Sequence, residues 1–307
     1  MTVKFCLRLP KVPSSADLGN GLQFHVEFPK GTVILIHGLT GTPKEVKYLA
    51  THLQRNGYSV ICPRLARHGE PMHILKYGKW HEFYKTVKDV LAKIPKEDTV
   101  FVGGLSMGAL LGLLLAEEFP DRVSGAVCFS PTLFYDGWNV PWSRHLLPLA
   151  YYTPIRYFAY HKEEPPYGIK NERIRRRVHN YYEKAVIHDA SEVSKYGYPY
   201  FPVTLYCELR KVINRVKERL PRVKAPVLMV QAYEDDMTSI KNSKYIYDHV
   251  GSSKKEIMYL YDSYHVITAD QERGKAAQKM VDFFDESLPH SNQADALSAS
   301  CGGQGSF

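Results

Sequence analysis

A serine between two glycines is the feature of this sequence best suited to chemistry. The segment G-L-S-M-G (residues 104–108) directly follows the apolar run Thr99–Gly103 and directly precedes an apolar helical segment. This context is typical of a nucleophile elbow, in which the serine adopts a strained turn that exposes its hydroxyl and the glycines leave room for the chain to cross from strand to helix. The pattern predicts that Ser106 is a nucleophile.

A serine nucleophile needs a general base, and the base needs a carboxylate that orients it. In sheets of this type the chain order is Ser, then Asp or Glu, then His, and active sites gather at the carboxyl ends of the strands. Asp235 and Asp236 follow the apolar run Val227–Gln231, and His265 follows the run Glu256–Tyr261. We therefore predict His265 as the base, and both aspartates are candidates for the carboxylate.

Acyl transfer also requires N–H groups that stabilise the oxyanion of the tetrahedral intermediate. The N–H of Met107 is one candidate, because it lies at the positive end of the helix that follows the serine. Leu39 is the second, because it lies in the glycine-containing loop after the strand Thr32–His37. We expect His37 and His68 to line or support the site. The loop matches neither common phosphate-binding spacing, which argues against a nucleotide site.

The elements that must position these residues alternate between β-branched runs and amphipathic segments. This rhythm is typical of βαβ units and predicts an α/β fold with a mostly parallel central sheet flanked by helices. We predict strands at Leu22–Glu27, Thr32–His37, Ser59–Cys62, Thr99–Gly103, Val123–Phe129, Pro226–Gln231 and Glu256–Tyr261. We predict helices at Lys44–Asn56, Gly78–Ile94, Met107–Phe119, Leu205–Leu220, Ser239–His249 and Ala269–Leu288.

The α/β rhythm is interrupted in the middle of the chain. Residues 134–204 are rich in Tyr, Trp and Pro and contain no clear strand, so we interpret them as an inserted helical cap. Residues 1–133 and 205–288 would then form the core, and the small polar residues 289–307 a disordered tail. The aromatic rings of the cap either cover an apolar pocket or form the hydrophobic core of the cap itself.

Composition excludes several classes of protein. With 307 residues, 44% of them hydrophobic, the chain can bury a large core, which argues against a disordered or fibrous protein. There is no apolar run of about 18 residues to span a membrane. The start lacks the apolar core of a signal peptide, and the five scattered cysteines have no zinc-site spacing. We therefore expect a cytoplasmic protein with reduced cysteines and no metal site.

The net charge of +8 raises the question of an anionic partner. No nucleic-acid-binding motif accompanies the basic residues, so we expect no nucleic-acid partner. The densest basic run, Lys170–Arg177, is either a solvated helix face or a surface that attracts an anionic substrate or makes weak contact with lipid headgroups.

At these motifs the sequence resembles the α/β-hydrolase superfamily, and more closely its bacterial carboxylesterases and monoacylglycerol-lipase-like enzymes. The resemblance rests on V-I-L-I-H-G-L-T-G-T-P (33–43), G-L-S-M-G (104–108), V-Q-A-Y-E-D-D (230–236) and S-Y-H-V-I-T (263–268), which occur in the family's order. It implies that Asp235 is the carboxylate of the triad, with Asp236 as the neighbour that could take its place.

Three positions depart from the family pattern. Tyr264 stands where the family usually has glycine, so we expect a bulkier pocket wall there. Ala109 replaces a frequent third glycine, which is a small packing change. Arg67 stands where relatives often have glycine, and it would place a positive charge near the mouth of the site or form a salt bridge to the cap.

Together these features predict a serine hydrolase that cleaves carboxylic esters through an acyl-enzyme on Ser106, with no metal or organic cofactor. The expected substrates are small esters with short to medium acyl chains, including monoacylglycerol-like molecules. The alternative is an acyltransferase or another specialised triad enzyme, because the fold and the nucleophile do not fix the acyl acceptor. The intact Ser, Asp and His set argues against a ligand-binding module without activity.

Overall fold

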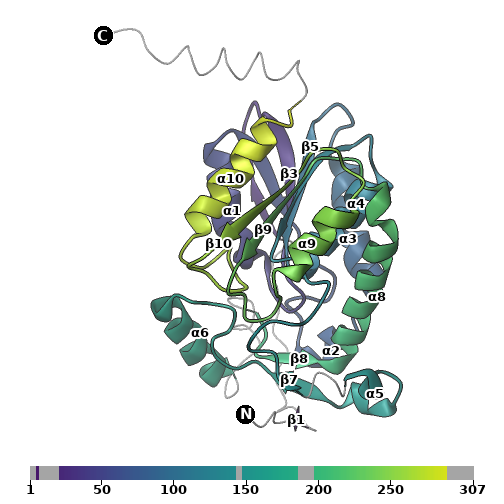
Figure 1. The fold of residues 1–307 in the computed structure, drawn as a ribbon, viewed down its shortest axis with the longest axis vertical. Coiled ribbons are helices and arrows are strands. Elements are labelled where there is room, and N and C mark those ends of the chain that lie inside the picture. The colour runs from purple at the N-terminus through teal and green to yellow at the C-terminus, as the bar shows by residue number, and fades with distance from the viewer. Residues whose placement is uncertain (1–4, 7–20, 143–146, 186–196, 289–307) are drawn as a thin grey trace.

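A seven-stranded sheet forms the centre of the protein (Figure 1). The computed structural model describes residues 5–6, 21–142, 147–185 and 197–288, so the predicted tail 289–307 lies outside the described residues. The strand order is β10-β9-β6-β5-β3-β4-β2, and all neighbours are parallel except β2 with β4. The strands are β2 (Leu22–Phe24), β3 (Gly31–Ile36), β4 (Tyr58–Cys62), β5 (Val100–Leu105), β6 (Val123–Phe129), β9 (Val227–Ala232) and β10 (Lys255–Leu260).

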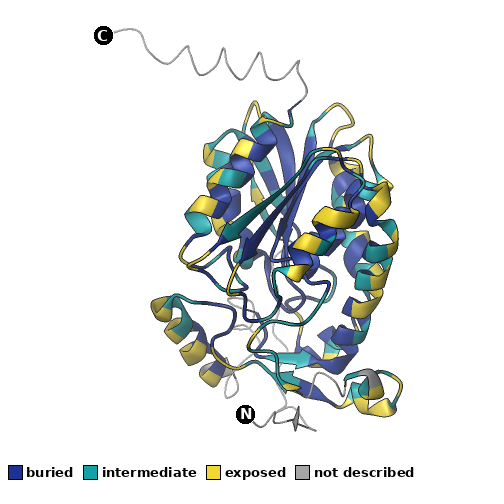
Figure 2. Cartoon of the chain, in the orientation of Figure 1, coloured by how far each residue is buried: buried dark blue, intermediate teal, exposed yellow. Residues whose placement is uncertain are grey.

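Helices cover both faces of this sheet (Figure 1). On one face lie α1 (Lys47–Arg55) and α10 (Arg273–Asp285), and on the other α3 (Trp80–Lys93), α4 (Met107–Glu118), α8 (Val203–Arg219) and α9 (Lys241–His249). Alternate residues of one strand therefore enter different cores: Ile34 and Ile36 pack with α3, α4 and α8, whereas Val33 and Leu35 pack with α1 and α10. This explains why the central strands are apolar without alternation, and Figure 2 shows them buried.

The helical patterns of the core are confirmed with small shifts of their ends. The predicted helix from Lys44 is divided into the 3-10 turn η1 (Pro43–Val46) and α1. The last helix starts at Arg273, not at Ala269, because both carboxylate oxygens of Asp270 accept N–H groups from neighbouring loops. Short elements complete this part of the chain: α2 (Met72–Leu75) and η4 (Leu220–Arg222). Within the described ranges, no helix has the length and apolar character needed to cross a membrane.

The segment between β6 and α8 departs from the prediction of a strand-free insertion. It contains the helical elements α5 (Leu147–Tyr151), η3 (Pro154–Tyr157) and α6 (Glu172–Ala185), as expected. It also contains β7 (Tyr160–Lys162) and β8 (Tyr200–Pro202), which form an antiparallel three-stranded sheet with β1 (Phe5–Cys6). The prediction of no strand was wrong here because these strands have only two or three residues each, too few to show an alternating pattern.

The aromatic stack between sheet and α10 provides a test of the core. Phe284 is fully buried and stacks on Phe101 with ring centroids 4.5 Å apart. Phe284→Ala should lower the free energy of unfolding by about 3–5 kcal/mol, because it leaves a cavity and removes this contact. Urea unfolding measures the loss. The control Phe28→Ala alters an 86% exposed ring and should change stability by less than about 0.5 kcal/mol; similar small effects for both variants would contradict the packing described.

Candidate active site

The turn between β5 and α4 holds Ser106 in a strained conformation. Its backbone has φ 57° and ψ −115°, a region that residues with a side chain seldom adopt. A Cβ atom at Gly104 would overlap the backbone of Gly108, and one at Gly108 would overlap the carbonyl of Ile36. The two glycines therefore permit the crossing from strand to helix that the sequence pattern predicted.

The hydroxyl of Ser106 lies 2.8 Å from the hydroxyl of Thr132. Thr132 follows β6, the strand next to β5, at the same carboxyl edge of the sheet. Sequence reasoning did not single out this threonine. The signal was present, however, because the rule that site residues follow the carboxyl ends of parallel strands applies to β6 as it does to β9 and β10.

His265 and Asp235 form a buried pair. The Nδ1 atom of His265 lies 3.0 Å from both carboxylate oxygens of Asp235. The carboxylate also accepts hydrogen bonds from the N–H and hydroxyl of Thr238 and from the N–H of Met237, which fix its orientation. Burial alone would lower the pKa of His265, but the charge of Asp235 and its hydrogen bond raise the pKa above its ordinary value.

Asp236 occupies a different position from its neighbour. Its carboxylate accepts the N–H of His265 at 3.2 Å and the N–H of Gly168 at 3.1 Å. Burial, and then the charge of Asp235, raise the pKa of Asp236 to about 6. The structure thus brings Asp235 to the imidazole ring, whereas Asp236 holds the backbone of His265 next to a loop of the segment 134–204.

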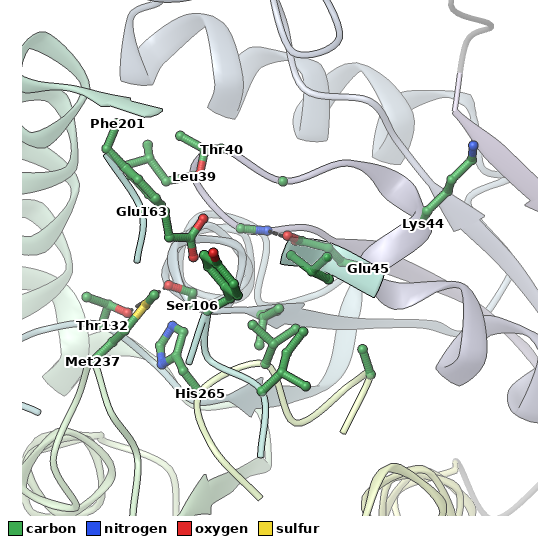
Figure 3. Close-up of a pocket in the computed structure, with 18 of the residues that line it drawn as sticks. Leu39, Thr40, Lys44, Glu45, Ser106, Thr132, Glu163, Phe201, Met237 and His265 are labelled. Atoms are coloured by element: carbon green, nitrogen blue, oxygen red, sulfur yellow. Dashed lines mark hydrogen bonds between the residues drawn. The ribbon is translucent and has the colours of Figure 1, made fainter. Parts of the chain in front are cut away.

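Ser106 and His265 line one cavity of about 450 Å³ (Figure 3). In this view the imidazole is directed toward the serine. The walls are mainly apolar and aromatic, and residues 134–204 contribute Tyr135, Tyr167, Ile169, Ile174, Val178, Tyr182 and Phe201. Other rings of that segment, Trp138, Trp142 and Tyr152, are exposed. Only some of the aromatic rings of the segment 134–204 therefore line the cavity.

Two of the departures from the family pattern lie elsewhere than expected. Tyr264 does not line the described cavity, because its ring packs edge-on against Trp138, 5.4 Å away between centroids. Arg67 neither reaches the cavity nor binds the cap: its guanidinium forms a bidentate pair with Glu82 of α3, at 2.8 and 2.9 Å. Glu82 lies in the first turn of α3, so this ion pair joins the loop of Arg67 to the core and not to the cap.

Two half-buried acids also line the cavity, and sequence reasoning missed both (Figure 3). Glu45 accepts the N–H of Gly38 at 2.9 Å, and Glu163 accepts the hydroxyl of Tyr182 at 3.0 Å. Burial raises the pKa of Glu45 to about 7 and that of Glu163 to about 8. No sequence motif marks them, because nothing local distinguishes a buried glutamate from an exposed one.

Of the predicted oxyanion donors, Leu39 lines this cavity and Met107 directly follows Ser106 as the first residue of α4. The structure gives the N–H groups of Leu39 and Met107 no acceptor within the described residues, so both can serve a ligand. His68 hydrogen bonds through Nε2 to the carbonyl of Leu39, and His37 accepts the N–H of Leu65 at 3.2 Å. Both histidines are buried behind the loop and do not line the cavity, so they support the site from outside. Burial lowers the pKa of each, which favours neutral rings.

Comparison with known proteins identifies the family. Residues 27–272 match the family described as serine aminopeptidase S33. The chain belongs to this hydrolase family. The predicted resemblance to α/β-hydrolases and the predicted fold class are thereby confirmed.

Proteins similar to this chain include enzymes named as a lipase and a carboxylesterase. A thermostable monoacylglycerol lipase from Bacillus sp. (strain H-257) is 27% identical over 87% of this chain and 95% of its own. A carboxylesterase from Bacillus subtilis (strain 168) is 24% identical over 83% of this chain and 92% of its own. The solved structure of Paleococcus ferrophilus monoacylglycerol lipase matches with a TM-score of 0.68 and 20% identity, over 89% of this chain and 98% of that one.

The separate positions of the two aspartates lead to a prediction. Asp235→Asn should lower kcat by about 10⁴-fold, because the amide favours the wrong tautomer of His265. Asp236→Asn should cost far less, because it leaves the imidazole partner unchanged. Steady-state kinetics on a p-nitrophenyl ester measure the loss of kcat in each variant, with samples that have the same folded fraction as the wild type. The reverse ranking would assign the orienting role to Asp236.

Proposed function

We propose that this S33-family protein is a carboxylic ester hydrolase whose catalytic triad is Ser106, His265 and Asp235. The observation that carries the proposal is that a serine at a strained strand-to-helix turn shares one cavity with a histidine that is paired to a buried carboxylate. The esterases among its relatives support the same activity.

The chemistry follows from this arrangement. The Oγ atom of Ser106 attacks the ester carbonyl while Nε2 of His265 accepts the hydroxyl proton, and Asp235 stabilises the resulting imidazolium. The N–H groups of Leu39 and Met107 stabilise the negative charge on the former carbonyl oxygen. The carbon–oxygen bond to the alcohol then breaks, and His265 donates its proton to the leaving oxygen. Water, activated by His265, hydrolyses the acyl-enzyme and releases the acid.

At rest the Ser106 hydroxyl is hydrogen bonded to Thr132, and no bond from Ser106 to His265 is present among the described residues. Attack therefore begins with rotation of the serine side chain from Thr132 toward the imidazole. In the acyl-enzyme Oγ is esterified and has no proton to donate, so Thr132 then acts only as a donor or as part of the cavity wall. This bond would hold the nucleophile in one rotamer while the site is empty.

The cavity suits esters with an apolar acyl chain and a small polar alcohol. Its aromatic and aliphatic walls favour the chain. The carboxyl group of Glu163 enters the same cavity near Ser106 (Figure 3), where it can exchange hydrogen bonds with an alcohol such as glycerol. We therefore propose short to medium acyl esters, including monoacylglycerols, as substrates.

We further propose that residues 134–204 act as a cap over the site and that the protein works in the cytoplasm. The cap proposal is supported by the many side chains that this segment contributes to the cavity wall. The location is supported by free thiols at Cys62, Cys128 and Cys207. The exposed arginines of α6, Arg173, Arg176 and Arg177, lie on its outer face and would allow weak contact with an anionic lipid surface.

The role of Ser106 can be tested directly. Ser106→Ala should lower kcat on a simple ester by several orders of magnitude and abolish labelling by a fluorophosphonate probe, because the nucleophile is absent. Thermal unfolding should change little, since alanine occupies the same turn. Retention of most activity by the variant would show that another residue attacks the ester.

The acyl-chain preference provides a second test. With p-nitrophenyl esters of graded length, kcat/KM should rise from acetyl to about butyryl or octanoyl, because each buried methylene adds about 0.8 kcal/mol until the cavity is full, and then fall. A continuous rise to emulsified triacylglycerols would indicate a true lipase instead. Low rates on every ester together with strong probe labelling of Ser106 would favour an acyltransferase, which a competing alcohol acceptor would reveal.

A further inference from the structure

The loop Gly38–Gly41, which carries the proposed oxyanion donor Leu39, is held by bonds from several sides. Within the loop, the N–H of Gly41 bonds the carbonyl of Gly38 at 3.2 Å. From outside, Tyr198 donates its N–H to Thr40 at 3.2 Å, and His68 bonds the carbonyl of Leu39. These bonds fix the carbonyl groups of the loop, but none of them holds its first N–H.

That first N–H, of Gly38, is held by the half-buried carboxyl group of Glu45 at 2.9 Å. Glu45 lies in η1, the 3-10 turn that begins directly after the loop. Its carboxyl group occupies the space where a side chain of residue 41 would lie, since a Cβ atom on Gly41 would overlap it. The absence of a side chain at Gly41 therefore allows Glu45 to reach back across the loop.

We propose that Glu45 is a positioning residue: by accepting the Gly38 N–H it aims the adjacent Leu39 N–H at the oxyanion. The inference rests on the proposed function, because it gives Glu45 a role in the same ester hydrolysis. Glu45 touches no reacting atom and acts through the loop.

The surroundings of Glu45 explain why its charge matters. The charge of Glu45 is coupled to those of His265, Glu163 and Tyr182, and the other titratable side chains that line the cavity are Lys44, Lys47, Tyr135, Tyr167 and Tyr206. Lys44, beside it in η1, is exposed, and no salt bridge to Glu45 forms within the described residues. Burial therefore raises the pKa of Glu45 to about 7, although the Gly38 N–H and His265 oppose this rise.

Ionisation of Glu45 should slow the reaction in two ways. A carboxylate beside the oxyanion loop repels the oxyanion that forms there. The same charge raises the pKa of His265 and so leaves less of it in the neutral form that accepts the serine proton. As the pH rises through about 7, wild-type activity should therefore be limited by the growing fraction of ionised Glu45.

The test compares Glu45→Gln, which mimics the neutral acid, with Glu45→Ala, which removes the acceptor of the Gly38 N–H. Glu45→Gln should match or exceed the wild type at pH 6 and exceed it at pH 8, because its amide cannot ionise, and the acid limb of its kcat/KM profile should move to lower pH. Glu45→Ala should lose about 10- to 100-fold in kcat at both pH values with little change in KM. The matched control Glu97→Gln, in an exposed loop at the opposite end of the strands, should leave the profile unchanged.

A double-mutant cycle tests the geometry independently. Gly41→Ala should displace the Glu45 carboxyl and reproduce the kcat loss of Glu45→Ala with Glu45 still present. The double variant Gly41→Ala/Glu45→Ala should lose no more than the larger single variant, because both changes break the same contact. Additive losses would overturn the proposal, as would full kcat in Glu45→Ala or an unshifted acid limb in Glu45→Gln.

Fluorophosphonate labelling of every variant separates this proposal from the one on which it rests. If the wild type is neither labelled nor active on esters, the proposed function fails. If Ser106 is labelled and Glu45→Ala turns over like the wild type, only the role of Glu45 fails. Thermal unfolding of each variant verifies that the folded fraction is matched, and Glu45→Gln preserves the test if Glu45→Ala does not fold.

Discussion

The rest of the site depends on one steric constraint, the sharp crossing of the chain from β5 into α4. The crossing brings Gly104 and Gly108 within backbone contact and forces Ser106 into a positive φ. This single turn raises the serine hydroxyl above the sheet edge and leaves the Met107 N–H without a partner inside the helix. The almost wholly apolar α4 is buried between the sheet and α8, which holds the strained turn in place.

Four carboxyl groups lie around this turn in a largely apolar setting: Asp235 and Asp236 are buried, Glu45 and Glu163 are half-buried, and their hydrogen bonds differ. The carboxylate of Asp235 accepts bonds from backbone, hydroxyl and imidazole groups, whereas that of Asp236 accepts the backbone N–H groups of Gly168 and His265. Glu45 and Glu163 each have one donor and no cationic partner within the described residues. The number of donors, more than residue type, decides which of these groups is suited to hold a charge when the site is empty.

The parts of the protein that depend on local pattern could be predicted from the sequence. The core strands and helices follow from apolar periodicity, and the positions of Ser106 and His265 follow from their places after strands. Thr132 obeys the same rule and could have been found. Glu45 and Glu163 could not, because their burial results from contacts between segments far apart in the chain. The two strands of the 134–204 segment were missed because three residues are too few to show a period.

The bonds of Asp236 and Asp270 have a consequence for engineering of the site. These two aspartates of the core hold Gly168, Lys170 and Asn171 of the 134–204 segment by their backbone N–H groups, and the same carboxylates hold the loop of His265. At Lys170 and Asn171 a backbone donor sets no requirement on the side chain, whereas Gly168 has a positive φ and no room for a Cβ beside Val266. These contacts therefore tolerate changes of side chain at 170 and 171, but neither replacement of Gly168 nor a change of loop length. A graft that exchanges the segment for one from another hydrolase should therefore keep the backbone path of residues 167–171 and vary the remainder.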